Sequence, residues 1–307
     1  MHILITGAGG FVGRYLAKEL TQNGHKVTAF DRAYGSPLEY AAKQIVGNIL
    51  DQKSIAGALT EKNPDACVHL AAITFVPSGE IHPNDLFSIN LTGTINLLAT
   101  MREYSPATRT LVISSAHVYG NVEKPTAFVE TDPLRPTTLY AISKAAAEMF
   151  ALSYANQHNI PVMAARPGNH TGPGQSPQFV VPAFAKQVAA IAAGKTEPVI
   201  HVGNIDSKRH FTDVRDVVRA YRLILEKGSA GSVYNISSPQ LVSVRDILNS
   251  LCNLGGISPK LIVDADKYRP TDCSPALDTS KAEKELGWQA EIKLETTLKD
   301  MLAEQTK

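Results

Sequence analysis

The fold of this chain is decided by its N-terminal stretch Leu4-Ile5-Thr6-Gly7-Ala8-Gly9-Gly10-Phe11-Val12-Gly13-Arg14. The stretch follows a short apolar strand pattern and leads into helical spacing of apolar residues over 11–22. Gly7 permits a tight strand-to-helix turn, Gly10 lets the backbone approach phosphates, and Gly13 allows the helix to pack closely on the strand. Because a helix N-terminus offers free N–H groups to an anion, the stretch predicts a site for a dinucleotide pyrophosphate, with a purely structural glycine turn as the alternative.

The second predicted strand, residues 26–30, ends beside an acidic residue. Asp31 stands where a carboxylate accepts hydrogen bonds from both hydroxyls of an adenosine ribose. Such a carboxylate favours NAD(H) and repels a 2′-phosphate, whereas the guanidinium of Arg32 is able to stack on adenine or pair with that phosphate. We therefore expect NAD(H) as the cofactor, with NADP(H) as a possible alternative cofactor. Helix capping by Asp31 is the alternative interpretation.

Composition and charge restrict the possible partners. The 307 residues are 44% hydrophobic and 19% charged, as in ordinary soluble proteins. The net charge of +1, with no run of Lys or Arg, argues against binding to nucleic acid or to an anionic membrane. Cys67, Cys252 and Cys273 lack metal-ligand spacing, so we expect no metal and a reducing compartment. A strand pattern from residue 2 argues against a signal peptide, and the apolar pattern over 180–193 is short for a membrane span, so we expect a cytoplasmic protein.

Strand and helix patterns alternate along the first half of the chain. After the first two, the expected strands cover 44–46, 66–70, 109–114 and 161–165, and the expected helices cover 52–62, 84–103 and 139–157. This alternation predicts an α/β protein with a Rossmann-type doubly wound parallel sheet. Ligands of such sheets bind beyond the carboxyl ends of the strands, where Gly7, Asp31, Ala71 and Ser115 fall.

The residue composition changes after Arg166, where a stretch rich in glycine and proline is typical of a loop. We expect residues 1–165 to form the dinucleotide-binding domain, rejoined by about 198–237 and 275–287. The remaining segments, 166–197, about 238–274 and 288–307, are expected to form a smaller mixed α/β substrate-binding lobe. Later expected strands cover 199–201, 232–236 and 260–263, and later expected helices cover 180–193, 213–227, 243–254 and 279–286.

A candidate catalytic pair lies in Tyr140-Ala141-Ile142-Ser143-Lys144, which places a phenol and an ammonium on one helix face. A nearby cation stabilises a phenolate and lowers the pKa of the tyrosine toward the range of an acid–base catalyst. Ser114 and Ser115 end the strand expected beside the nicotinamide, where a hydroxyl is able to bond a substrate oxygen. Taken singly, a Tyr–Lys pair arises often by chance, and serines after a strand are usually loop formers.

Together, the glycine stretch, Ser115 and the Tyr140/Lys144 pair resemble the extended short-chain dehydrogenase/reductase family, whose members act mostly on nucleotide sugars. The resemblance covers nearly the whole chain and extends to His69-Leu70-Ala71-Ala72, to Asn90-Leu91-Thr92-Gly93-Thr94-Ile95-Asn96-Leu97-Leu98 and to Arg166-Pro167-Gly168-Asn169. It implies that Tyr140 exchanges a proton with the sugar oxygen, that Lys144 holds the nicotinamide ribose and tunes Tyr140, and that Ser115 shares the substrate oxygen.

A dinucleotide site follows from the glycine stretch, from Asp31 and Arg32, and from this resemblance. Asn48 falls where many relatives carry an Asp that contacts adenine, and its amide is able to make the same hydrogen bond. Asn90 is expected as indirect support for the site. The candidate cofactor-binding residues are Gly7, Gly10, Phe11, Val12, Gly13, Asp31, Arg32, Asn48, Ile49, Leu70, Ala71, Ala72, Asn90, Ser114, Tyr140, Lys144 and Arg166.

The segment after Ser115 bears on the reaction. Family members that dehydrate sugars carry a Glu where this chain has His117, because loss of water needs a base for the C5 proton. His117 is able to serve as a base, but the missing carboxylate makes dehydration the less favoured interpretation.

The stretches 166–177, 202–204, 208–216 and 268–272 resemble the GDP-6-deoxy-4-ketomannose branch, which contains reductases that make GDP-D-rhamnose or GDP-6-deoxytalose and also the GDP-mannose 4,6-dehydratases. This branch usually has Asp at position 210, where this chain has His. Guanidinium forks suit a diphosphate, with surface salt bridges as the alternative role for the arginines. The candidate substrate-binding residues are Ser115, His117, Asn169, Arg209, Arg269 and Asp272.

These features together predict a reductase that transfers hydride from NAD(P)H to the C4 ketone of GDP-6-deoxy-4-ketomannose and gives a GDP-6-deoxyhexose. The alternatives are an NAD-dependent nucleotide-sugar 4-epimerase, which needs the same Ser115, Tyr140 and Lys144, and, less favoured, a 4,6-dehydratase or a non-catalytic dinucleotide-sensing protein. As in relatives, we expect the helices over 84–103 and 139–157 to pair with their copies in a homodimer.

Overall fold

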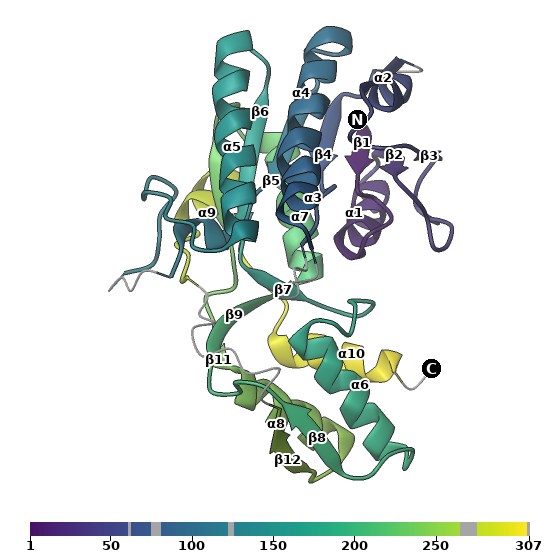
Figure 1. Ribbon diagram of the computed structural model, residues 1–307, viewed down its shortest axis with the longest axis vertical. Coiled ribbons are helices and arrows are strands. Elements are labelled where there is room, and N and C mark those ends of the chain that lie inside the picture. The colour runs from purple at the N-terminus through teal and green to yellow at the C-terminus, as the bar shows by residue number, and fades with distance from the viewer. Residues whose placement is uncertain (61–62, 75–80, 122–125, 265–274, 306–307) are drawn as a thin grey trace.

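The computed structural model of the protein describes residues 1–60, 63–74, 81–121, 126–264 and 275–305. Within these residues the larger lobe is built on a seven-stranded parallel sheet of order β10-β6-β5-β4-β1-β2-β3 (Figure 1). Its strands are β1 (His2–Thr6), β2 (Lys26–Asp31), β3 (Lys43–Val46), β4 (Ala66–His69), β5 (Arg109–Ile113), β6 (Val162–Pro167) and β10 (Val233–Ile236). The predicted Rossmann-type sheet is confirmed.

Helices cover both faces of this sheet. One face carries α1 (Phe11–Gln22), α7 (Val214–Lys227) and α9 (Ser280–Leu286), and α1 has the bounds that the apolar spacing predicts. The other face carries α2 (Gln52–Thr60), α4 (Gly93–Tyr104) and α5 (Leu139–His158), of which α4 and α5 lie side by side in Figure 1. The buried core on the first face is dominated by aliphatic side chains of β1, α1 and α7.

The helix predicted over 84–103 has an irregular middle. It consists of α3 (Pro83–Phe87), a π-helical turn (Ser88–Thr92) and α4. The backbone N–H of Asn84 donates to Nδ1 of His82 at 3.2 Å, which caps the first turn. Such π-turns occur often at functional sites, and this one contains Asn90.

The smaller lobe holds most of the elements that the sequence pattern missed. Within the described residues, a three-stranded sheet joins β7 (Asn169–Thr171), β9 (Lys208–Asp213) and β11 (Leu241–Ser243). A two-stranded sheet pairs β8 (Val199–Val202) with β12 (Lys260–Val263). Three helices pack against one another in this lobe, α6 (Val180–Ala192), α8 (Val244–Gly255) and α10 (Leu294–Glu304). The strands β7, β9 and β11, the helix α10 and a 3₁₀ turn at Ala116–Tyr119 were not predicted.

The position of β8 leads us to a different proposal for the domain division. β8 lies outside the central sheet, and its Ile200 and Val202 belong to the core of the smaller lobe together with Phe211. The chain therefore returns to the larger lobe at α7 rather than near residue 198. We propose 1–168, 214–237 and 275–290 as the dinucleotide-binding domain, and the other described segments as the substrate-binding lobe.

None of the helices in the described part of the chain combines the length and the apolar character that a membrane span requires.

Candidate active site

The three glycines of the N-terminal motif have different surroundings. Gly7 has a φ of +72°, and a Cβ built on it lies 2.6 Å from the backbone nitrogen of Ala71. A Cβ on Gly13 lies 2.5 Å from the carbonyl oxygen of Ala8, so the close packing of α1 on its turn requires glycine. Gly10, the N-cap residue of α1, meets only the carbonyl oxygen of Gly7, at 3.3 Å.

The N-terminus of α1 fits a dinucleotide pyrophosphate. No side chain caps this helix end, and its first turn carries no acidic residue. Backbone N–H groups at such an end attract a phosphate anion. The extended backbone of Gly10, without a side chain, leaves room for an anion to approach.

Replacing Gly7 by Ala should weaken NAD(P)H binding and lower the free energy of unfolding. The new Cβ clashes with the backbone of Ala71, and a left-handed conformation costs a non-glycine residue about 1–2 kcal/mol. Gly24 is the matched control, because it has a φ of +79° but nothing within 4 Å of its Cβ position. Fluorescence titration with NADPH and urea unfolding measure both effects. Equal losses in the two variants would contradict the clash.

Asp31 ends β2 and holds the glycine turn. Its Oδ2 accepts a hydrogen bond from the backbone N–H of Gly9 at 2.8 Å, and its Oδ1 accepts one from the N–H of Arg32 at 2.6 Å. No helix begins here, so the alternative interpretation as a helix cap is wrong. The Arg32 side chain is exposed next to this carboxylate.

The other residues expected near the adenosine differ in their roles. Asn48 uses its Oδ1 to accept from the N–H of Leu50 at 3.0 Å, which fixes the turn after β3. Ile49 is buried in a core cluster, and a Cβ on Gly93 of α4 lies 2.9 Å from it. Ile49 therefore packs α4 against this turn, a structural role that the sequence did not indicate.

The segment after β4 is tied to β1 through a buried histidine. His69 bonds to the hydroxyl of Thr6 at 2.7 Å through Nδ1 and to that of Thr94 at 3.0 Å through Nε2. Burial, followed by the charge of Lys144, lowers the pKa of His69 to about 3, so the imidazole stays neutral. The backbone N–H of Ala71 donates to Thr6 Oγ1 at 3.4 Å. These bonds fix Leu70, Ala71 and Ala72 beside the glycine turn.

The predicted catalytic side chains come together at the end of β5. Ser115 is buried, its Oγ accepts from the N–H of His117 at 3.2 Å, and it forms a hydrogen bond with Tyr140. Tyr140 lies in the first turn of α5, which Thr138 caps by accepting from the N–H of Ala141 at 3.2 Å. The Nζ of Lys144 donates to the carbonyl oxygen of Ile113 at 2.7 Å.

The pKa of Tyr140 shifts in the direction opposite to the one predicted. Burial raises it to about 12, and the hydrogen bond with Ser115 offsets only part of this rise. The charge of Lys144 is not among the causes of this shift, and its ammonium donates to the carbonyl oxygen of Ile113. Burial lowers the pKa of Lys144 itself to about 8. The tyrosine therefore keeps its proton at neutral pH, which suits a group that donates a proton.

Asn90 supports the catalytic helix from the π-turn. Its Oδ1 accepts from the N–H of Ile73 at 2.8 Å, and its Nδ2 donates to the carbonyl of Ile73 at 3.1 Å and to Ser143 Oγ at 2.9 Å. Ser143 in turn donates to the carbonyl oxygen of Tyr140 at 2.7 Å. Both ends of the Asn90 amide are thus occupied, and we interpret it as support for the turn of Tyr140 rather than as a direct cofactor contact.

Two buried polar atoms near this site lack a hydrogen-bond partner within the described residues. They are Oγ of Ser114, at the carboxyl end of β5, and Nδ2 of Asn169, in β7 of the smaller lobe. A buried polar group is normally bonded, so both atoms fit a bound ligand. Ser114 lies where a nicotinamide is expected, and Asn169 where a diphosphate is expected.

The remaining predicted substrate residues divide into two groups. Arg209 lies in β9 and is partly buried. It stands two positions before Phe211, which pairs with Asn169 of the neighbouring strand β7. His117 follows Ser115 in the 3₁₀ turn. Arg269 and Asp272 lie outside the described residues.

Arg166 does not have the surroundings of a cofactor contact. Its guanidinium is buried, donates from Nε to both carboxylate oxygens of Glu148 at 3.1 Å, and donates from Nη1 to Tyr119 Oη at 2.7 Å and to the carbonyl of Glu130 at 2.9 Å. Tyr119 donates to Oδ1 of Asn235 at 2.8 Å. We propose that Arg166 acts inside the core rather than at the cofactor. Glu148, a charged residue one turn after Lys144 on the buried side of α5, was the sequence signal for a buried partner.

Among the described residues, no group of three or more His, Cys, Asp or Glu side chains is arranged to hold a metal ion.

Comparisons with known proteins agree with this geometry. The family model for GDP-mannose 4,6 dehydratase matches residues 4–301. GDP-6-deoxy-D-mannose reductase of Pseudomonas aeruginosa is 32% identical over 304 residues, which cover 98% of this chain and 96% of that protein. The structure of RMD from Pseudomonas aeruginosa complexed with NADPH has a TM-score of 0.88 at 31% identity and covers 99% of this chain and 98% of the other.

A UDP-glucose 4-epimerase from Thermus thermophilus, in complex with NAD, has a TM-score of 0.88 at 25% identity and covers 100% of this chain and 99% of the other. Structural relatives thus hold either NADPH or NAD, in agreement with NAD(H) as the predicted cofactor and NADP(H) as the open alternative. The chain therefore belongs to the GDP-mannose 4,6-dehydratase family, within the NAD(P)-dependent enzymes of the extended short-chain dehydrogenase/reductase type.

Proposed function

We propose that the protein is a nucleotide-sugar reductase that acts on the C4 ketone of GDP-6-deoxy-4-ketomannose and gives a GDP-6-deoxyhexose. One observation carries the proposal: Ser115, protonated Tyr140 and Lys144 lie together, and the residue that follows in the 3₁₀ turn is His117 rather than a carboxylate. The set suits proton donation to a ketone oxygen. The guanosine assignment is supported by the reductase of Pseudomonas aeruginosa.

NAD(P)H, when bound, supplies the hydride for the carbonyl carbon. Ser115 donates a hydrogen bond to the ketone oxygen and holds it beside the Tyr140 hydroxyl. Tyr140 gives its proton to that oxygen, so the C=O group becomes a CH–OH group and the tyrosine is left as a phenolate. Lys144 stabilises this phenolate as a cation, and a proton from solvent restores the phenol. Asn169 and Arg209 are proposed to hold the diphosphate, since both offer N–H donors.

The test is a direct assay of the purified protein with freshly made GDP-6-deoxy-4-ketomannose and either NADH or NADPH. Loss of nicotinamide absorbance, followed by NMR of the product, establishes the reduction and the configuration at C4. No oxidation of either dinucleotide would refute the reductase. Assays on intact UDP-hexoses and GDP-hexoses then examine the 4-epimerase, the alternative that the Thermus thermophilus structure favours.

The pH dependence of kcat/KM should follow Lys144. The pKa of its ammonium is lowered to about 8, so the cation is present below pH 8 and lost above it. We expect kcat/KM for the reduction to fall as the pH rises through 8, while Tyr140, with a pKa of about 12, remains protonated. A pH series with Lys144→Met as control measures this. The variant should be slow at every pH and lack the fall, and a wild-type rate that rises across this range contradicts the assignment.

We further propose a cytoplasmic homodimer in which α4 and α5 pair with their copies. Large apolar side chains are exposed on these helices, namely Leu139 (47%), Ile142 (39%) and Met149 (62%) on α5 and Tyr104 (42%) on α4. Large exposed apolar side chains along neighbouring helices are typical of an interface. The widely spaced cysteines support a reducing compartment such as the cytoplasm.

Replacing Met149 by Arg should shift the protein from dimer to monomer, because an unpaired charge would enter the helix interface. Light scattering after size-exclusion chromatography measures the mass. Leu241→Arg is the control, since Leu241 is 52% exposed but lies on β11 in the other lobe. A Met149→Arg protein with the mass of the wild type would exclude this interface.

A further inference from the structure

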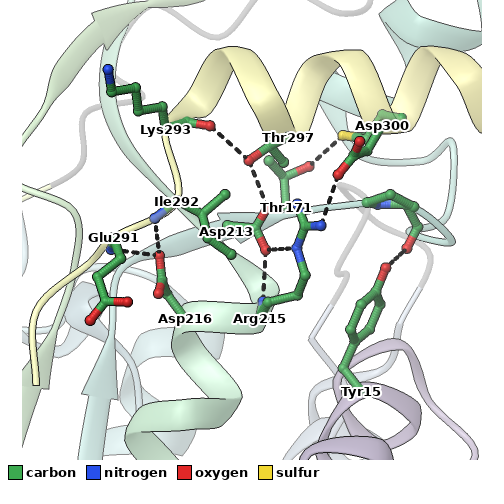
Figure 2. A network of polar contacts seen from close by, with 12 residues as sticks. Tyr15, Thr171, Asp213, Arg215, Asp216, Glu291, Ile292, Lys293, Thr297 and Asp300 are labelled. Carbon is green, nitrogen blue, oxygen red and sulfur yellow. Dashed lines mark hydrogen bonds and ion pairs between the residues drawn. The ribbon is translucent and has the colours of Figure 1, made fainter.

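A group of polar side chains joins the two lobes where β9 ends and α7 begins, as Figure 2 shows. We call Asp213, Arg215, Thr297 and Asp300 the interlobe joint. The Asp213 carboxylate is fully buried and accepts from the N–H of Arg215 at 2.8 Å, from its Nε at 2.8 Å and from its Nη2 at 2.7 Å. The hydroxyl of Thr297 donates to the same carboxylate at 2.6 Å, and Nη1 of Arg215 donates to Asp300 at 2.8 Å.

The joint connects elements that belong to different cores. Val214 and Val217 of α7 lie in the core of the larger lobe, whereas Leu298 and Met301 of α10 lie in the core of the smaller lobe. Asp213 is thus a buried anion shared between the lobes. A carboxylate with this many donors is well stabilised only while each of them stays in place.

Two further contacts reinforce the connection. The buried carboxylate of Asp216 accepts from the N–H groups of Glu291 at 2.9 Å and Ile292 at 2.8 Å, just before α10. Tyr15 of α1 donates to the carbonyl oxygen of Pro173 at 2.8 Å, in the segment that follows β7 (Figure 2). Each contact crosses from the larger lobe to the smaller one.

The joint also anchors the strands that carry the proposed diphosphate residues. Asp213 is the last residue of β9, the strand of Arg209, and it is the register partner of Thr171 in β7, the strand of Asn169. A rotation at Asp213 therefore moves both strands together relative to Tyr140.

We propose that the interlobe joint fixes the distance between the ketone of the bound nucleotide sugar and Tyr140. Asp213 and Thr297 are then positioning residues for the ketone. This inference rests on the proposed function: a nucleotide sugar held at its diphosphate by β7 and β9 presents its C4 oxygen to Ser115 and Tyr140 only at one lobe orientation. Neither Asp213 nor Thr297 touches the substrate, and each acts through the strand or helix that it holds.

The test compares Thr297→Val, which removes the hydroxyl that donates to Asp213, with Thr297→Ser, which keeps it. A misplacement of about 1 Å costs about a hundredfold in rate, so kcat/KM for the ketosugar should fall at least about tenfold in Thr297→Val and recover in Thr297→Ser. The dissociation constants of NADPH and of GDP alone, measured by calorimetry, should stay unchanged, because each of these ligands meets one lobe. Arg245→Gln, which breaks the exposed pair with Asp206 within the smaller lobe, is the control.

Two results would overturn the inference while the function stands: a Thr297→Val protein with the wild-type kcat/KM, or one that loses affinity for NADPH and GDP in parallel, as general damage would cause. If the wild type does not reduce the ketosugar, the proposed function fails, and a distance measurement decides about the joint. Spin labels at Val46→Cys and Val263→Cys, exposed residues of the two lobes, are placed in a Cys273→Ser background. A broader distance distribution in Thr297→Val than in Thr297→Ser supports the joint, and identical distributions refute it.

Discussion

Replacing Tyr140 by Phe should lower kcat for the reduction by at least about a hundredfold, since a positioned general acid contributes about 10²–10⁴. The ring and its packing stay, and only the hydroxyl that bonds with Ser115 is lost. The dissociation constant of NADPH should therefore remain unchanged. Stopped-flow loss of nicotinamide absorbance measures the chemical step, and fluorescence titration measures binding.

The matched control for Tyr140→Phe is Tyr234→Phe. Tyr234 is also buried, and its hydroxyl donates to Glu285 at 2.8 Å, but it lies on β10 away from the serines of β5. Loss of the Tyr234 hydroxyl should change kcat by less than about twofold, because kcat falls only when an interaction with the transition state is removed. A Tyr140→Phe enzyme that keeps its rate would move the proton donor to another group, with His117 as the next candidate.

Replacing Arg166 by Met should destabilise the fold by about 3–5 kcal/mol, because Glu148 would be left as a buried charge without its partner. Both side chains are almost completely buried, with 6% and 2% exposed. Urea unfolding measures the change in the free energy of unfolding. NADPH affinity of the folded fraction should be unchanged, which separates the core role from the cofactor contact that the sequence predicted.

Two variants complete this experiment. The double variant Arg166→Met/Glu148→Leu removes both charges and should regain much of the lost stability, since apolar replacement of a whole buried pair is often neutral. Arg245→Met breaks an exposed pair and should cost about 0–1 kcal/mol. If Arg166→Met cost no more than Arg245→Met, the buried pair would not stabilise the protein.

The regular elements of the larger lobe were predictable because they carry their own periodic pattern. The helix over 11–22 and the parallel strands have apolar residues at the spacing that the sheet and its covering helices need. The short strands β7, Asn169–Thr171, and β9, Lys208–Asp213, are polar and lack alternation, so no local signal marks them. The pairing of β8 with β12 joins segments far apart in the sequence, which a local pattern does not reveal.

The sequence indicated which residues make up the candidate site better than it indicated their pKa values. The order of Ser115, Tyr140 and Lys144 indicated a catalytic set, and the structure brings these residues to one end of β5. The direction of the pKa shift of Tyr140 depends on burial, a property of the packed molecule that residue spacing does not contain. The buried pair of Arg166 and Glu148 was not predicted for a related reason, because Glu148 lies on another element.

The division of the smaller lobe into separate stretches of chain has an evolutionary consequence. In the division that we propose, the described residues of this lobe are 169–213, 238–264 and 291–305, with returns to the larger lobe between them. A single recombination point therefore cannot exchange one relative's lobe for another's. New sugar preferences in such a chain are expected to arise by point substitutions and loop changes within an inherited lobe, while the dinucleotide half is kept intact.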